Sequence, residues 1–177
     1  KFIESLNILI EDFNFINFQA IVLGSDQGRT VYKKKLMNLV ERYHLNKKVK
    51  FINHCREMPL AYSLADVVVS ASIEPEAFGR VAVEAQAMSK PIIASNIGGS
   101  KETILNKKTG FLYKFDDPRE LAKSLNTVIQ LTQEELQLMG NEGRKNITKK
   151  FDVETMCETN LNEYKKLLKN SCLKFNF

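Results

Sequence analysis

The stretch that decides the fold is residues 67–95, VVVSASIEPEAFGRVAVEAQAMSKPIIAS. Its first four residues, 67–70, form a short apolar run that is typical of a strand covered on both faces. Residues 80–88 are rich in Ala and Val and predict a helix, and residues 92–95 form a second apolar run after a proline. A strand, a helix and a second strand in this order predict one βα unit of a parallel sheet.

The same alternation continues outward from this stretch. Short apolar or β-branched runs predict further strands at 18–23, 49–52 and 111–113. Gly98-Gly99 predicts a turn into a short helix, and apolar residues at helical spacing predict helices before each of the first two strands (Phe2, Leu6, Leu9 and Ile10; Tyr32, Leu36, Leu39 and Val40). The predicted fold class is α/β, with a Rossmann-like parallel sheet and helices on both faces.

The last third of the chain has only helical spacing. Three apolar stripes predict C-terminal helices, and Gly140 and Gly143 predict a break before the last of them (stripes Leu121, Leu125, Val128 and Ile129; Leu136 and Met139; Cys157, Leu161, Tyr164 and Leu168). No repeat or linker divides the sequence, so we expect residues 1–177 to form one domain.

The beginning of the sequence is unusual for this class. A doubly wound domain normally begins with its central strand, whereas this sequence begins at Lys1 directly with a helical pattern. We therefore expect the domain to lack its first strand and the chain to be a fragment of a larger protein.

Composition narrows the function classes. The chain is 44% hydrophobic and 27% charged, and no apolar run approaches the about 20 residues of a membrane helix. The net charge of +5 comes mainly from lysines in short runs such as Lys33–Lys35, which are usually solvated; contact with an anionic membrane or an acidic substrate stays open. No aromatic pattern accompanies them, which disfavours nucleic acid.

The cysteines and acidic residues indicate the expected compartment and metal content. Cys55, Cys157 and Cys172 form no paired motif, which disfavours disulfides or zinc and fits a reducing cytoplasm. The sequence also contains no Asp-x-Asp pair of the kind that holds a cation in metal-dependent transferases. We expect no metal and no cofactor.

Three turns follow predicted strands, at 24–28, 72–79 and 96–100, and ligands of parallel sheets bind beyond such strand ends. Gly79 lies where a helix begins, so unpaired N–H groups and the helix dipole favour an anion such as diphosphate. Glu76 in the loop and Glu84 in the helix can face one crevice and accept hydrogen bonds from sugar hydroxyls. An equally weighted alternative is that Glu76 only favours the helix start and Glu84 is solvated.

These motifs together resemble a known family. Residues 72–85, SIEPEAFGRVAVEA, followed by Lys90-Pro91 and Gly98-Gly99, are similar to the donor-binding domain of family 4 (group 1) retaining glycosyltransferases of GT-B fold. That family carries a Glu-x7-Glu motif, then a Pro-led strand, a Gly-Gly turn, a Glu and a Thr-Gly. Glu102 and Thr109-Gly110 match the last two, and the resemblance extends over nearly the whole chain.

The resemblance implies roles for individual positions. Glu84 would bind the ribose hydroxyls, and Glu76 would be the catalytic residue beside the donor sugar. The base would lie near Asn53, His54 and Cys55. The full donor-binding set implied in this way is Gly24, Glu76, Ala77, Phe78, Gly79, Arg80 and Glu84.

Three departures from the family pattern qualify these roles. Ser89 stands where the family usually has Gly, which changes the helix end without removing a ligand contact. Asn53 also replaces a frequent Gly, which leaves the base-binding assignment open. The Arg and Lys that neutralise the leaving diphosphate normally precede the first helix, and no residue here matches them.

The function implied is donor binding for retaining hexosyl transfer from a nucleoside diphosphate sugar to an acceptor such as lipopolysaccharide or another glycan. A GT-B nucleotide-sugar epimerase and a non-catalytic nucleotide-binding module are the alternatives. The expected partners are the nucleotide sugar and an N-terminal acceptor domain absent from this chain, which alone would bind donor without transferring sugar. The expected location is the cytoplasm, with peripheral contact at the inner face of the membrane left open.

Overall fold

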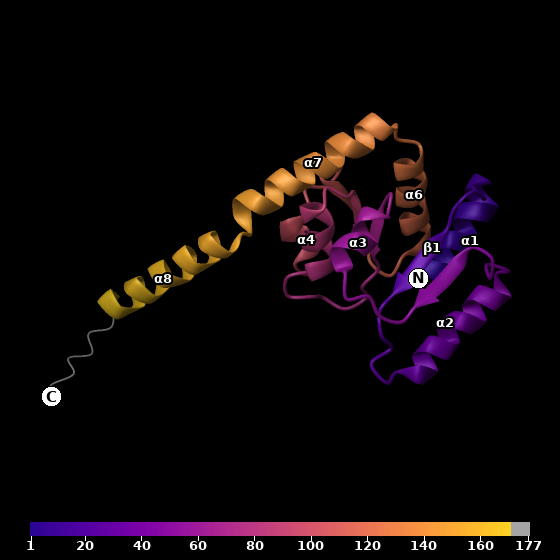
Figure 1. Ribbon diagram of the computed structural model, residues 1–177, viewed down its shortest axis with the longest axis horizontal. Coiled ribbons are helices and arrows are strands. Elements are labelled where there is room, and N and C mark those ends of the chain that lie inside the picture. Colours follow the sequence, from indigo (N-terminus) through magenta and orange to yellow (C-terminus); the bar gives the residue numbers. More distant parts are fainter. Residues whose placement is uncertain (171–177) are drawn as a thin grey trace.

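The computed structural model describes residues 1–170, which form an α/β body and a projecting C-terminal helix (Figure 1). All predicted strands are present, within two residues of their predicted bounds: β1 Ala20–Leu23, β2 Val49–Ile52, β3 Val68–Ser70, β4 Ile92–Ser95 and β5 Gly110–Tyr113. The helices alternate with them and then follow them: α1 Phe2–Phe13, α2 Thr30–Arg42, α3 Met58–Ser63, α4 Arg80–Ala87, α5 Ser100–Thr103, α6 Pro118–Ile129, α7 Gln133–Lys150 and α8 Val153–Asn170.

The strands form two parallel sheets. β1 pairs with β2 from Ala20 opposite Val49 to Leu23 opposite Ile52. β4 is the centre of the second sheet, with β3 on one side and β5 on the other, both parallel to it. Among the described residues no strand joins β1 to β3. The prediction of a further strand concerns sequence before Lys1 and stays a prediction.

Helices cover both faces of β4. Ile93 belongs to a core that also contains residues of α1, α6, β1 and β2. Ile92 and Ala94 belong to a second core, formed with α3 and α4. Successive side chains of a strand point to opposite faces, so one strand contributes to both cores. This is the predicted α/β arrangement.

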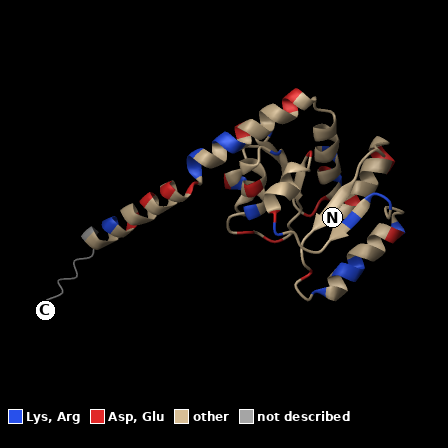
Figure 2. Cartoon of the chain, viewed as in Figure 1, with Lys and Arg blue, Asp and Glu red and all other residues tan. Residues whose placement is uncertain are grey.

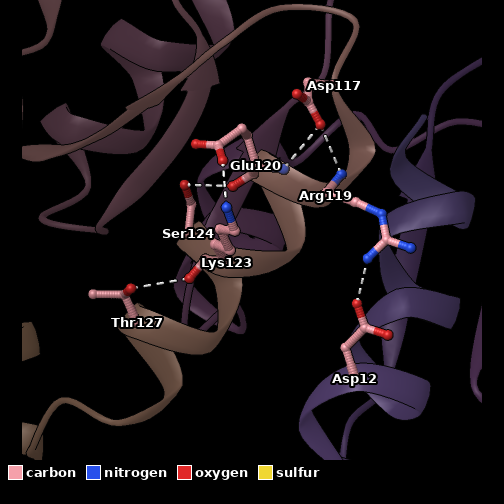
Figure 3. A network of polar contacts seen from close by, with 7 residues as sticks. All are labelled: Asp12, Asp117, Arg119, Glu120, Lys123, Ser124 and Thr127. Atoms are coloured by element: carbon pink, nitrogen blue, oxygen red, sulfur yellow. Dashed lines mark hydrogen bonds and ion pairs between the residues drawn. The ribbon is translucent and has the colours of Figure 1, made fainter.

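The joint between α1 and α6 connects the first segment of the chain with a late one (Figure 3). The Asp117 carboxylate accepts hydrogen bonds from the backbone N–H groups of Arg119 and Glu120, at 3.0 and 3.1 Å, and so caps the start of α6. The Arg119 guanidinium then lies 2.7 Å from the Asp12 carboxylate on α1. Capping and ion pairing therefore fix the same end of the first core.

The predicted helix break at Gly140 and Gly143 is wrong, because α7 continues through both residues. A Cβ on Gly140 would collide with the backbone carbonyl oxygen of Ser89, and one on Gly143 would lie 3.1 Å from the Gln86 Cγ. Both glycines are buried and lie against the end of α4. They allow two helices to approach closely, and the chain instead breaks at Phe151.

Two further features complete the described chain. α3 was not predicted; its segment, MPLAYS, is six residues long with a proline near its start, too short to show a helical stripe. α8 projects away from the body (Figure 1), and in residues 1–170 no helix is both long and apolar enough to cross a bilayer. Cys55 and Cys157 are free, and Cys172 lies outside the described residues.

Candidate functional site

An open crevice of about 700 Å³ lies where the loops after β1 and β3 face each other, which is a volume that suits a small ligand. Both loops follow the carboxyl ends of parallel strands, where the sequence placed the ligand. Its lining comes from one turn with the start of α2 and from one motif loop: Gly28, Arg29, Thr30, Val31, Tyr32 and Lys35; Ser72, Ile73, Glu74, Pro75 and Glu76.

The two walls of the crevice carry opposite charges. Arg29 and Lys35 lie on the α2 wall, whereas Glu74 and Glu76 lie on the motif-loop wall. Cations attract a phosphate group, and carboxylates accept hydrogen bonds from sugar hydroxyls. The sequence did not predict Arg29 or Lys35 as crevice residues, because the loop that faces a strand-to-helix turn is known only from the folded structure.

Glu76 lies in the loop, as predicted, and is held there from two directions. Its side-chain oxygen Oε1 accepts a hydrogen bond from the Ser72 hydroxyl. Its backbone carbonyl accepts one from the Gly99 N–H at 2.8 Å. A Cβ on Gly98 would collide with the Glu76 backbone, and one on Gly99 would collide with the Phe78 carbonyl. The Gly98-Gly99 turn therefore packs closely against the backbone of the Glu76 loop.

α4 begins after Gly79, as the sequence predicted, and anion binding at this helix start stays a prediction. Gly79 is in the left-handed region, at φ 76° and ψ 59°, which explains a glycine there. Within the described part of the chain, no side chain caps this helix start. The first N–H groups of α4 are thus available to an anionic ligand.

Glu84 lies one turn further along α4 and has two partners. Its Oε2 accepts a hydrogen bond from the Tyr62 hydroxyl at 2.9 Å, and its Oε1 lies 3.0 Å from the Arg80 guanidinium. Burial, followed by the hydrogen bond and charge of Glu84, raises the pKa of Tyr62 well above its ordinary value. Sequence reasoning missed Tyr62 together with its helix, α3.

The remaining predicted residues do not line the crevice. Gly24 is exposed directly after β1, and Asn53 accepts a hydrogen bond from the Lys33 ammonium at 2.7 Å. The ring of Phe78 packs edge to face on Phe151, with centroids 5.6 Å apart. Of the predicted donor-binding residues, only Glu76 lines the crevice (outside its lining are Gly24, Ala77, Phe78, Gly79, Arg80, Glu84, and the proposed base-binding Asn53, His54 and Cys55).

A metal centre needs several ligand side chains close together. Within residues 1–170, no three His, Cys, Asp or Glu side chains gather closely enough to hold a metal ion. The expectation of a metal-free site stays a prediction.

Comparison with known proteins identifies the family. The family described as Glycosyl transferases group 1 matches residues 1–146. This chain belongs to the group 1 glycosyltransferases. Its fold is that of the C-terminal domain of a GT-B enzyme: it superposes on the C-terminal domain of the group 1 family protein LpcC from Francisella tularensis with a TM-score of 0.73 at 27% identity, covering 86% of this chain and 78% of that one.

Two longer relatives give the scale of the match. The group 1 domain is 28% identical to the capsular polysaccharide biosynthesis glycosyltransferase CapM of Staphylococcus aureus, over 95% of this chain and 44% of CapM. HepE of Anabaena, solved in complex with UDP-glucose, matches with a TM-score of 0.83 at 28% identity, over 93% of this chain and 44% of HepE. The chain thus spans less than half the length of either relative.

Proposed function

We propose that this group 1 domain binds the donor, a nucleoside diphosphate sugar such as a UDP-hexose, for transfer with retention to a glycan acceptor. The observation that carries the proposal is Glu76, held by Ser72 and Gly99 at a crevice whose opposite wall bears Arg29 and Lys35. UDP is the preferred nucleotide because HepE was solved with UDP-glucose.

The proposed chemistry needs no protein nucleophile. The bond between the anomeric carbon and the diphosphate oxygen breaks, the acceptor hydroxyl oxygen bonds to the anomeric carbon on the same face, and the hydroxyl proton passes to the departing diphosphate. The uncapped start of α4 stabilises the charge of the leaving diphosphate, and Arg29 and Lys35 contribute further positive charge. Glu76 orients the sugar and Glu84 holds the ribose. This mechanism uses no metal or cofactor.

The proposal assigns no acceptor-binding role to the 177 residues themselves. The relation to CapM favours a capsular or similar bacterial polysaccharide, with lipopolysaccharide as another member of the same acceptor class. We propose that acceptor binding belongs to an N-terminal domain, so that the chain alone binds donor and transfers no sugar.

Calorimetric titration tests donor binding. We expect UDP and UDP-glucose to bind the wild-type chain, and Glu84→Gln to weaken UDP by about tenfold or more, because it removes a charged acceptor for the ribose hydroxyls. Glu76→Gln should weaken UDP-glucose more than UDP. Glu134→Gln, an exposed carboxylate at the start of α7, is the matched control and should leave both affinities unchanged.

Two results would contradict the proposal. Absence of binding to UDP, GDP and ADP, free or sugar-linked, would exclude a nucleotide-sugar site. Equal losses for Glu84→Gln and Glu134→Gln would exclude the assigned role of Glu84 in binding the ribose. With the full-length protein, sugar transfer from radiolabelled donor would distinguish a transferase from a binding module, which turns over no donor.

The proposed location is the cytoplasm, with the lysine-rich face of α2 against the inner membrane. Figure 2 shows basic residues along this helix; among lysines 33–35, Lys34 and Lys35 are exposed, and exposed Met37 follows them on the same helix. Basic residues beside apolar ones favour an anionic lipid surface. Sedimentation with anionic vesicles should carry the chain down at low salt, whereas neutral vesicles or replacement of all three lysines by glutamine should abolish this.

A further inference from the structure

The Tyr62 hydroxyl binds the Glu84 carboxylate from the core side. Its side chain belongs to the core formed by α3, α4 and β4, and the residue is only 7% exposed. Its hydroxyl donates a hydrogen bond to the Glu84 Oε2 at 2.9 Å. A buried phenol with a charged acceptor has one favourable orientation, because a buried donor left unpaired is costly.

The second partner of Glu84 constrains it much less. The Arg80 guanidinium lies on the same helix, 3.0 Å from Oε1, and its side chain is 84% exposed. An exposed ion pair between neighbouring turns of one helix contributes little and exchanges readily with water or ligand. Tyr62 is therefore the contact that fixes the carboxylate, while Arg80 can leave it when a ligand arrives.

The orientation that Tyr62 imposes has a chemical consequence. With Oε2 occupied from the core side, the remaining acceptor positions of Glu84 are on its exposed side, since this side chain is 35% exposed. A cis-diol presents two hydroxyl donors, and a carboxylate fixed in orientation accepts from both. A carboxylate free to rotate pays additional ordering entropy on binding.

We propose that Tyr62 is a positioning residue that fixes Glu84 for the ribose diol and thereby sets the preference for ribonucleotides over dideoxyribonucleotides. The inference rests on the proposed function, because it needs Glu84 to bind ribose. Tyr62 itself touches no ligand. Its effect is confined to the part of the binding free energy that comes from the 2′- and 3′-hydroxyls.

The test compares UDP with 2′,3′-dideoxy-UDP on the wild-type chain and on Tyr62→Phe. Phe keeps the ring in the core and removes only the hydroxyl. We expect UDP affinity to fall by about tenfold, which corresponds to one charge-assisted hydrogen bond, and dideoxy-UDP affinity to stay unchanged. In a Glu84→Gln background the same substitution should no longer change the ratio between the two ligands.

Tyr113→Phe is the matched control. Tyr113 is also buried, and its hydroxyl also has a side-chain partner, because it accepts from the Ser95 hydroxyl at 2.9 Å. Its removal should change neither affinity. Thermal unfolding of both variants gives the cost of losing a buried hydroxyl, separately from the ligand ratio.

The outcomes separate the two hypotheses. Equal weakening of UDP and dideoxy-UDP by Tyr62→Phe would show a purely structural tyrosine and overturn the inference, as would unchanged affinity for UDP. If Glu84→Gln weakens UDP while Tyr62→Phe does not alter the ratio, the proposed function stands and only this inference fails. If wild type binds no UDP, both fail.

Discussion

The two sheets differ in how completely their strands are buried. All four residues of β4 are buried, and helices lie on both of its faces. In the two-stranded sheet only Ala20 and Val49 are buried, while Ile21 is 54% and Ile52 is 43% exposed. One wall of the crevice follows the three-stranded sheet and the other follows the two-stranded sheet. The two walls therefore follow sheets that are buried to different extents.

The anchoring of the two walls shows the same difference. The Glu76 loop is tied to the turn after β4 through the Gly99 N–H, in a space that admits no Cβ. In the opposite turn, the Gly28 N–H donates to the Asp26 carboxylate and the Arg29 N–H to the Asp26 carbonyl, both within the turn itself. We infer that the motif-loop wall is preorganised and that the α2 wall adapts to a ligand.

The largest expected effect separates the sheets directly. Ile93→Ala removes a fully buried side chain at the centre of the three-stranded sheet and should cost about 2–5 kcal/mol of unfolding free energy. Ile21→Ala, on the exposed face of β1, should cost less than about 1 kcal/mol. Urea unfolding followed by circular dichroism measures both. Equal losses would show that the sheets are equally consolidated.

A second pair of variants examines the packing of α7 on α4. Gly140→Ala forces a methyl group into the Ser89 carbonyl and should cost about 1–3 kcal/mol. Gly143→Ala meets only the flexible Gln86 side chain, and the better helix propensity of Ala offsets that contact, which leaves a change within about 0.5 kcal/mol. Thermal unfolding of both variants is the measurement, and a tolerated Gly140→Ala would contradict the close approach.

A smaller effect, of opposite sign, is expected at the end of α4. Ser89 has φ 54°, with its N–H donating to the Gln86 carbonyl and the Lys90 N–H donating to the Ala85 carbonyl, a Schellman arrangement that favours glycine. Ser89→Gly should stabilise the chain by up to about 1 kcal/mol. Asn14→Gly, at φ 55° after α1, is the control and should gain less, because Asn tolerates this region. A loss of stability in Ser89→Gly would contradict the strain.

The smallest effect is expected at the contact between α2, the helix that carries the basic wall, and Asn53 after β2. Lys33→Met removes the exposed hydrogen bond to Asn53 and should change the unfolding free energy by less than about 0.5 kcal/mol. Lys35→Met, at the crevice, is the matched control. A loss of more than about 1.5 kcal/mol for Lys33→Met alone would show that this wall is held as firmly as the other.

The sequence predicted those parts of the fold in which local pattern and burial agree. The first three residues of Ile92–Ser95 are apolar because β4 is covered on both faces, and Glu76 and Glu84 lie in the loop and helix where spacing placed them. The helix break predicted at Gly140 and Gly143 was wrong because a glycine required by a neighbouring helix and a glycine that ends a helix look alike in sequence. Tyr62 and the basic wall depend on contacts across 20 or more residues, which no local pattern contains.

The contact between Phe78 and Phe151 gives the far end of the chain a mechanical relation to the motif loop. Phe151 stands at the junction of α7 and α8, and α8 is 18 residues long. At 1.5 Å per residue α8 extends about 27 Å, so a tilt of about 10° at this junction displaces its tip by about 5 Å. A tilt that carries the Phe151 ring with it changes the angle between two rings whose centroids lie 5.6 Å apart and whose planes lie 62° from parallel. Ring-current shifts of Phe78, which is two residues from Glu76, would therefore report the direction of α8 in an NMR spectrum.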